Sequence, residues 1–183
     1  IKNADVVIAT DPDSDRLGVC VKHGEEYRLL SGNEIGIILF DYIVKARTKI
    51  GTMPKNPLII KTIVSSSMIN EIAKKHECEV KEVLTGFKNI ASEILNLEKQ
   101  GELSRYVFGF EESNGYLSGT YVRDKDAVSA ALLVCEAAAY YKQKSNMTLY
   151  DILFGLWEEY GFFGEKTLSF EFKGHEGNLN IDN

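Results

Sequence analysis

The hydrophobic pattern of the chain alternates between short apolar runs and longer stretches with helical spacing. Runs rich in β-branched and aromatic residues predict strands at residues 5–10, 17–22, 27–30, 58–64, 79–84, 106–110 and 167–172. Apolar positions three and four residues apart predict helices between Ser31 and Gly51 and at residues 67–76, 89–99, 126–144 and 148–161. Strands that alternate with helices in this way are typical of a layered α/β fold, with a mixed, largely parallel sheet flanked by helices.

Three of the predicted strands are followed by loops that contain charged and hydroxyl side chains able to bind a ligand. These loops begin at Asp11, Thr85 and Glu111. In open α/β sheets, ligands collect at the carboxyl ends of the strands. We therefore expect the three loops to meet at one edge of the sheet and to form a ligand site there.

The first loop, Asp11-Pro12-Asp13-Ser14-Asp15-Arg16, is the most informative segment of the chain. It follows a strand that we predict to be buried. Three carboxylates at alternate positions repel one another unless a cation lies among them, and oxygen ligands suit a hard ion such as Mg²⁺ or Ca²⁺. The planar guanidinium of Arg16 matches phosphate oxygens. The loop therefore predicts a site for a metal and a phosphate together.

Other acidic loops fit this segment less well. An EF-hand needs Gly at the sixth loop position and Glu at the twelfth, where this chain has Arg16 and Lys22. Phosphatases of the haloacid-dehalogenase type carry the motif D-x-D-x-[TV], with Thr or Val at the fifth position, where this chain has Asp15. A solvated acidic turn would leave three like charges without a neutralising partner. A metal site is the interpretation that accounts for all three carboxylates.

The other loops give weaker signals when each is taken alone. Glu111 and Ser113 can together hold neighbouring sugar hydroxyls, although an ordinary charged turn has the same composition. Lys88 lies at a helix start, a position favourable to anions. Arg123 and Lys125 precede a helix whose N-cap we predict at Asp126, and they could meet an anion or make surface ion pairs of little energetic value. The serine run at residues 65–67 has no histidine or acid at a motif spacing, so it indicates the start of a helix.

In this order, the loops resemble the α-D-phosphohexomutase family, which includes phosphoglucomutases and phosphomannomutases. The matching segments are residues 10–16, 85–88, 109–116 and 124–126, and the resemblance covers nearly the whole chain. The chain is most similar to the phosphoglucomutase branch that also contains phosphopentomutase-like enzymes. Members have four domains. The resemblance implies that residues 1–30 end domain 2 with the metal-binding loop and a hairpin, that residues 31–164 form domain 3, and that residues 165–183 begin a linker toward domain 4.

The resemblance also implies roles for individual residues. Mg²⁺ would be bound by Asp11, Asp13 and Asp15, and the ion would also contact a phosphoserine. The roles implied for the other residues are neutralisation of the transferring phosphoryl group by Arg16, acid–base or charge-stabilising help from Lys125, and substrate binding by Lys88, Glu111, Ser113 and Arg123.

The function that follows is the interconversion of hexose 1-phosphate and 6-phosphate, with glucose phosphates as the expected substrates. No Thr-Ala-Ser-His-Asn-Pro-like segment is present, so we expect the catalytic serine in other domains of the same chain and no activity from these residues alone. Alternatives are a phosphomannomutase or phosphopentomutase of the same family, a haloacid-dehalogenase-type phosphatase, and a non-catalytic sugar-binding or metal-binding module.

Composition sets outer bounds on this interpretation. The 183 residues are 44% apolar and 26% charged, as in ordinary globular proteins, and the net charge of −6 argues against a general nucleic-acid or membrane surface. No apolar run is long enough to span a bilayer, and no signal-peptide pattern is present. The three cysteines lie far apart, which predicts buried, reduced thiols and a cytoplasmic protein. The chain starts at Ile1 and ends in a polar, linker-like segment, so we expect a piece of a longer protein.

Overall fold

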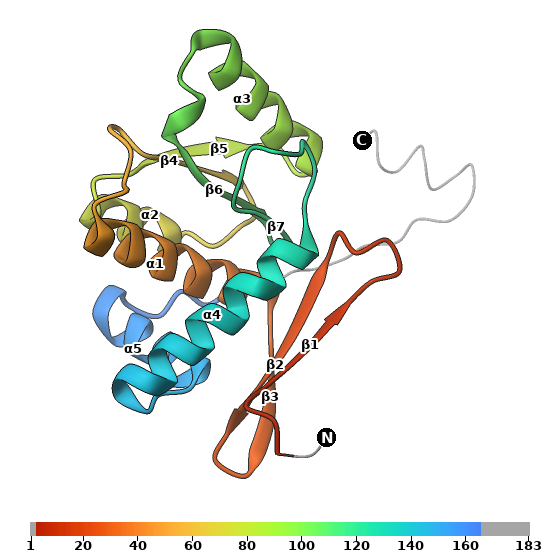
Figure 1. Cartoon of the computed structure of the whole chain (residues 1–183), viewed down its shortest axis with the longest axis vertical. Coiled ribbons are helices and arrows are strands. Elements are labelled where there is room, and N and C mark those ends of the chain that lie inside the picture. The colour runs from red at the N-terminus through yellow and green to blue at the C-terminus, as the bar shows by residue number, and fades with distance from the viewer. Residues whose placement is uncertain (1–2, 166–183) are drawn as a thin grey trace.

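The computed structural model describes residues 3–165, which form two separate sheets and five α-helices (Figure 1). The first sheet is antiparallel, with the strand order β1 (Val6–Thr10), β2 (Leu17–His23) and β3 (Glu26–Leu30). The second has the order β5 (Glu79–Val83), β4 (Leu58–Thr62), β6 (Tyr106–Glu111) and β7 (Gly115–Leu117). Strands β5, β4 and β6 are parallel and β7 is antiparallel. The prediction of a mixed, largely parallel sheet flanked by helices is confirmed.

One expectation about the first strand is wrong. Strand β1 does not belong to the parallel sheet, and it is not buried: Val6 to Ile8 are half-buried, while Ala9 and Thr10 are exposed. Within residues 3–165, β1 pairs only with β2, because the chain returns after the acidic loop as an antiparallel neighbour. The acidic loop therefore reaches the other loops from a second sheet rather than along a shared sheet edge.

The five helices begin and end close to the predicted positions. They are α1 (Gly32–Ile50), α2 (Met68–Lys75), α3 (Phe87–Gln100), α4 (Ala127–Ser145) and α5 (Leu149–Tyr160), with a short 3-10 turn, η1 (Leu103–Arg105), before β6. Capping boxes start α1 and α5, at Ser31 and Thr148, and the side chain of Asp126 caps α4. Strand β7 was not predicted. The strand predicted at residues 167–172 lies outside the described residues.

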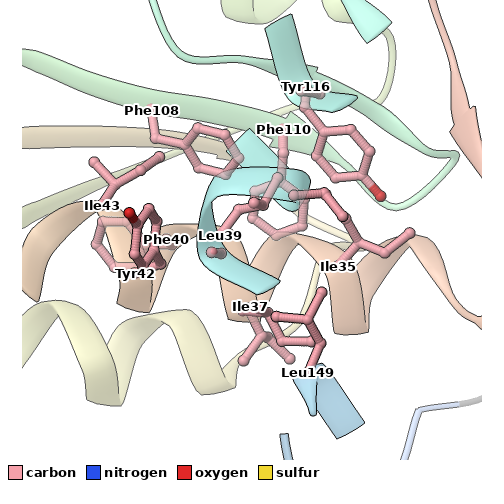
Figure 2. Packing of buried hydrophobic residues seen from close by; sticks show 14 of the residues in the cluster. Ile35, Ile37, Leu39, Phe40, Tyr42, Ile43, Phe108, Phe110, Tyr116 and Leu149 are labelled. Atoms are coloured by element: carbon pink, nitrogen blue, oxygen red, sulfur yellow. The ribbon is translucent and has the colours of Figure 1, made fainter. Parts of the chain in front are cut away.

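Helices cover both faces of the parallel sheet. Figure 1 shows α3 on one face and α1 and α2 on the other. The larger core lies on the α1 face, where the rings of Phe108, Phe110 and Tyr116 stack with centroids 5.9 to 6.4 Å apart (Figure 2). A side chain at Gly36 would place Cβ 2.4 Å from the Phe110 ring, so glycine is what allows α1 to pack this closely on β6.

The thiols are less buried than predicted, although they are unpaired as expected. Cys20 and Cys78 are half-buried and Cys135, on α4, is exposed; all three are unpaired. Cys135 falls on the solvent side of α4, because the buried stripe of this helix runs through Ala130, Val134, Ala137 and Tyr141. No helix in the described part of the chain is both long enough and apolar enough to cross a bilayer.

Candidate active site at the junction of the two sheets

The acidic loop is a tight turn held by its own backbone. Oδ1 of Asp11 accepts hydrogen bonds from the backbone N–H groups of Asp15 (3.2 Å) and Arg16 (3.0 Å), and Ser14 adopts a positive φ of 58°. The bond from the Arg16 N–H is the strongest influence on Asp11, and together with the bonds from Asp15 it outweighs desolvation and lowers the pKa of Asp11. Asp11 is therefore a carboxylate at neutral pH, held in a fixed orientation.

The three carboxylates of the loop converge. One oxygen from each of Asp11, Asp13 and Asp15 lies within 4.8 Å of the others. Oδ1 of Asp15 is buried and has no hydrogen-bond partner within residues 3–165. A hard divalent cation takes carboxylate oxygens as ligands, and a buried oxygen without a donor is the kind of atom that such an ion satisfies. The residues present therefore fit Mg²⁺.

Lys125 lies against this cluster. Its Nζ is 2.8 Å from Oδ2 of Asp15 and 3.4 Å from Oδ1 of Asp124, and it stands 5.8 Å from the centroid of the Phe87 ring. Burial alone would lower the pKa of Lys125, but the hydrogen bond and charge of Asp15, together with the charge of Asp124, outweigh it and raise the pKa. The side chain is consequently a fixed ammonium at neutral pH.

Backbone contacts join the acidic loop to the turn between β6 and β7. Arg16 and Gly115 form an isolated antiparallel bridge. The backbone N–H of Leu17 donates to the carbonyl of Asn114, and the side-chain amide of Asn114 donates to the carbonyl of Leu17, each over 3.0 Å. The N–H of Ala127, at the start of α4, donates to the carbonyl of Ser14 (3.1 Å). The acidic loop is therefore seated directly on the parallel-sheet unit.

Glu111 is the last residue of β6, and Ser113 lies within that turn. Glu111 is buried at the end of β6, and a Cβ on Gly115 would lie 3.0 Å from its Cγ and its Oε1 and 2.6 Å from Cδ of Lys125. Glu111 and Lys125 thus pack over the same glycine. Ser113 is half-buried and shares a hollow of about 690 Å³ with Asp11 and Arg16.

The remaining predicted residues lie further along the loops. Lys88 is exposed in the first turn of α3, next to the Phe87 ring that Lys125 contacts. Arg123 is held by the carbonyl of Thr120 (2.6 Å) and by Oε2 of Glu98 (2.8 Å) on α3. The structure therefore gathers the acidic loop, Arg16, Lys125, Glu111 and Ser113 at one place, whereas Arg123 is engaged in its own ion pair.

Sequence reasoning missed a polar network behind the turn. Its buried members are Lys61, Thr62 and Ser65 at the carboxyl end of β4, and they contact the exposed Glu82 and the half-buried Glu112. The serine run was interpreted only as the start of a helix, and Ser66 does fill that role by accepting the N–H of Met68 (3.3 Å). The signal that could have revealed the network is a lysine and a threonine at the end of the otherwise apolar run Leu58 to Ile60.

The family model for phosphoglucomutase/phosphomannomutase, alpha/beta/alpha domain III, matches residues 31–160. The chain belongs to the phosphoglucomutase/phosphomannomutase family. A phosphoglucomutase from Staphylococcus epidermidis is 37% identical to this family member over 182 residues, which are 99% of this chain and 32% of the relative. A phosphomannomutase from Mycoplasmoides pirum is 39% identical over 173 residues, 93% of this chain and 30% of the relative. The chain thus spans about a third of the length of these relatives.

Solved structures show the same fold. A phosphoglucomutase/phosphomannomutase family protein from Burkholderia thailandensis superposes with a TM-score of 0.62 at 19% identity, over 85% of this chain and 29% of that chain. An apo N-acetylglucosamine-phosphate mutase, of the alpha-D-phosphohexomutase superfamily, superposes with a TM-score of 0.57 at 17% identity, over 87% of this chain and 40% of that chain. At these identities the likeness establishes the architecture of this family member and nothing finer.

Proposed function

We propose that this chain carries the metal loop and the sugar-holding loops of an enzyme that moves a phosphoryl group between positions 1 and 6 of a hexose phosphate. The observation that carries the proposal is the convergence of the Asp11, Asp13 and Asp15 carboxylates within 4.8 Å, with the Lys125 ammonium against Asp15. Phosphoryl transfer depends mainly on positioning and on neutralisation of charge, and this arrangement can supply both.

Each charged group has a distinct part in this proposal. Asp11, Asp13 and Asp15 hold Mg²⁺, which when bound withdraws charge from the phosphoryl oxygens as a Lewis acid. The guanidinium of Arg16 is about half exposed (53%) and can pair in a bidentate way with phosphate oxygens. The raised pKa of Lys125 favours a charge-stabilising role for its ammonium over a role as general base.

The sugar ring is assigned to the turn after β6. The Glu111 carboxylate accepts hydrogen bonds from ring hydroxyls, and the Ser113 hydroxyl donates to or accepts from a neighbouring one. Lys88 extends from the start of α3 toward the substrate. Arg123 stays a candidate for substrate binding. Its guanidinium is bound to Glu98 and to the Thr120 carbonyl, so contact with a substrate requires the exchange of that ion pair.

We assign this activity to a polypeptide that contains the other domains, because the chain spans about a third of its relatives. The division into residues 1–30, 31–164 and 165–183 belongs to this proposal, as do a phosphoserine supplied by another domain, a cytoplasmic setting and the inactivity of residues 1–183 alone. Phosphomannomutase activity is the second candidate, favoured by the Mycoplasmoides pirum relative at 39% identity. A phosphopentomutase activity is a third.

An assay of the full-length protein tests the proposal. Purified enzyme is given glucose 1-phosphate, mannose 1-phosphate and a pentose 1-phosphate in parallel, and both phosphate transfer and release of free phosphate are followed. We expect the isomerised sugar phosphate with no free phosphate, and the highest kcat/KM with glucose 1-phosphate. Release of phosphate with an aspartyl-phosphate at Asp11 would instead support a haloacid-dehalogenase-type phosphatase. Binding without conversion would support a non-catalytic module.

A further inference from the structure

Two consecutive residues at the carboxyl end of β4 are polar and fully buried. Lys61 is 1% exposed and Thr62 is 0% exposed, in the central part of the parallel sheet. An apolar residue would fill either position without an electrostatic penalty, whereas a buried charge is expensive unless it is paired. The contacts of these two side chains show what they hold.

Lys61 connects β4 to the neighbouring strand β5. Its Nζ donates to the carbonyl of Ser65 (3.1 Å) and lies 2.8 Å from Oε1 of Glu82. Lys61 and Glu82 are directly opposite each other in the parallel ladder. Glu82 is three residues before Thr85, where the loop that carries Lys88 begins. The buried ammonium therefore fixes the end of β5 from which that loop departs.

Thr62 connects β4 to the strand on the other side. Its Oγ1 lies 2.8 Å from Oγ of Ser65 and 2.9 Å from Oε2 of Glu112. The hydroxyl of Thr62 donates its single proton to Glu112, so in the other contact Ser65 donates to Thr62. The hydrogen bonds run in one direction, from Ser65 through Thr62 to Glu112.

The main chain of Glu112 is held on its other side by α1. A Cβ on Gly32 would lie 1.9 Å from the carbonyl oxygen of Glu112, which shows how closely this backbone packs on the first residue of the helix. Tyr116, beyond the turn, donates from its hydroxyl to the carbonyl of the same glycine (2.9 Å). The turn that carries Ser113 is thus fixed by the Thr62 hydroxyl through its side chain and by α1 through its backbone.

We propose that Thr62 is a positioning residue that sets the Glu111–Ser113 turn for sugar binding, with Lys61 fixing the neighbouring Lys88 loop from the same strand end. The inference rests on the proposed function, since it assigns the geometry of the substrate-binding turn to a side chain behind it. Thr62 is fully buried, and its role is to hold Glu112 so that the spacing between Glu111 and Ser113 is kept.

Replacement of Thr62 in the full-length enzyme tests this. Thr62→Val keeps the shape of the side chain and removes the hydroxyl, and Thr62→Ser restores it. We expect Thr62→Val to raise the KM for glucose 1-phosphate about tenfold with a smaller change in kcat, because without the hydrogen bond to Glu112 the turn that binds the sugar is no longer held in place, and Thr62→Ser to return KM to within about twofold of wild type. The Mg²⁺ concentration for half-maximal turnover should not change. Thr48→Val, at an exposed position of α1, is the matched control.

A purely structural role would lower the melting temperature and the active fraction while KM stayed the same, and that result would overturn the proposal. Should Thr62→Val fail to fold, Glu112→Ala removes the same contact from its half-buried partner. A KM equal to that of wild type in Glu112→Ala would also overturn the proposal. In the double variant, KM should not rise beyond that of the worse single variant. Absence of mutase turnover in the wild type, by contrast, counts against the proposed function itself.

Discussion

Nζ of Lys125 lies 2.8 Å from Oδ2 of Asp15, so the acidic loop of the first sheet and the segment before α4 meet in an ion pair. Oδ1 of the same carboxylate is buried and has no hydrogen-bond partner among the described residues. The two oxygens therefore differ: Oδ2 is engaged by the ammonium, whereas Oδ1 has only the more distant Nε of Arg16, at 3.9 Å, as a charged neighbour. Lys125 offsets part of the repulsion among the three carboxylates without filling the cluster.

Removal of the Lys125 charge should change Mg²⁺ affinity and turnover in opposite directions. In Lys125→Met, Asp15 loses a neighbouring cation, so we expect Mg²⁺ to bind about three- to tenfold more tightly in a calorimetric titration. Turnover of the full-length enzyme should fall by roughly a hundredfold or more, because a charge that stabilises the transferring phosphoryl group is lost. Lys125→Arg should keep the Mg²⁺ affinity near that of the wild type. Weaker Mg²⁺ binding by Lys125→Met would argue against this arrangement.

Gly115 should tolerate no side chain. In Gly115→Ala, Cβ would press on Lys125 and Glu111 at 2.6 and 3.0 Å, so both side chains must move. We expect a loss of about 1–3 kcal/mol in the free energy of unfolding and a higher KM for the sugar phosphate. Gly155→Ala is the control: nothing lies within 4 Å of its Cβ on α5, and it should stabilise the protein by about 0.5–1 kcal/mol. Equal effects at the two sites would contradict the packing argument.

The buried carboxyl of Asp41 should give stability a measurable pH dependence. Burial raises the pKa of Asp41, and the ammonium of Lys45, 2.8 Å from Oδ1, offsets this only in part. Because the folded pKa exceeds the ordinary value of 3.8, the contribution of Asp41 to stability is complete below pH 3.8 and is lost as the pH rises through the folded pKa. Asp41→Asn should therefore gain stability relative to wild type over that interval.

Urea unfolding of both proteins between pH 3 and 7 measures the difference. Burial lowers the pKa of His76 and the charge of Asp41 opposes this, so the two groups are coupled, and the comparison is repeated with His76→Gln in both proteins to remove the histidine from it. A difference in unfolding free energy that does not change with pH would show that Asp41 is not the source.

Local patterns were sufficient for most elements of the fold. The helix starts at Ser31, Asp126 and Thr148 followed from side chains that satisfy free backbone N–H groups within a few residues, which a sequence displays directly. Strand β7 was missed because Gly115–Leu117 is too short to show alternation and exists through its pairing with β6. The place of β1 could not be inferred either, since an apolar run does not reveal which partner strand it will have.

In the candidate site too, features that are local in sequence could be predicted, whereas contacts between distant residues could not. The acidic loop was recognisable because its three carboxylates are local in sequence, and their convergence follows from one turn. The pairing of Lys125 with Asp15 joins residues 110 positions apart, and the contact of Thr62 with Glu112 spans 50. Such contacts depend on how the two sheets and the helix layer pack, and no spacing rule expresses them.

The Mg²⁺ dependence of turnover in full-length Asp13→Asn tests the central claim most directly. Asp13 is exposed and, within residues 3–165, its side chain makes no hydrogen bond or ion pair, so its replacement should change the unfolding free energy by no more than about 0.5 kcal/mol. We predict that the Mg²⁺ concentration for half-maximal conversion of glucose 1-phosphate rises at least about tenfold. The same Mg²⁺ dependence in wild type and Asp13→Asn would contradict the assignment of this loop as the metal site of a phosphoryl-transfer enzyme.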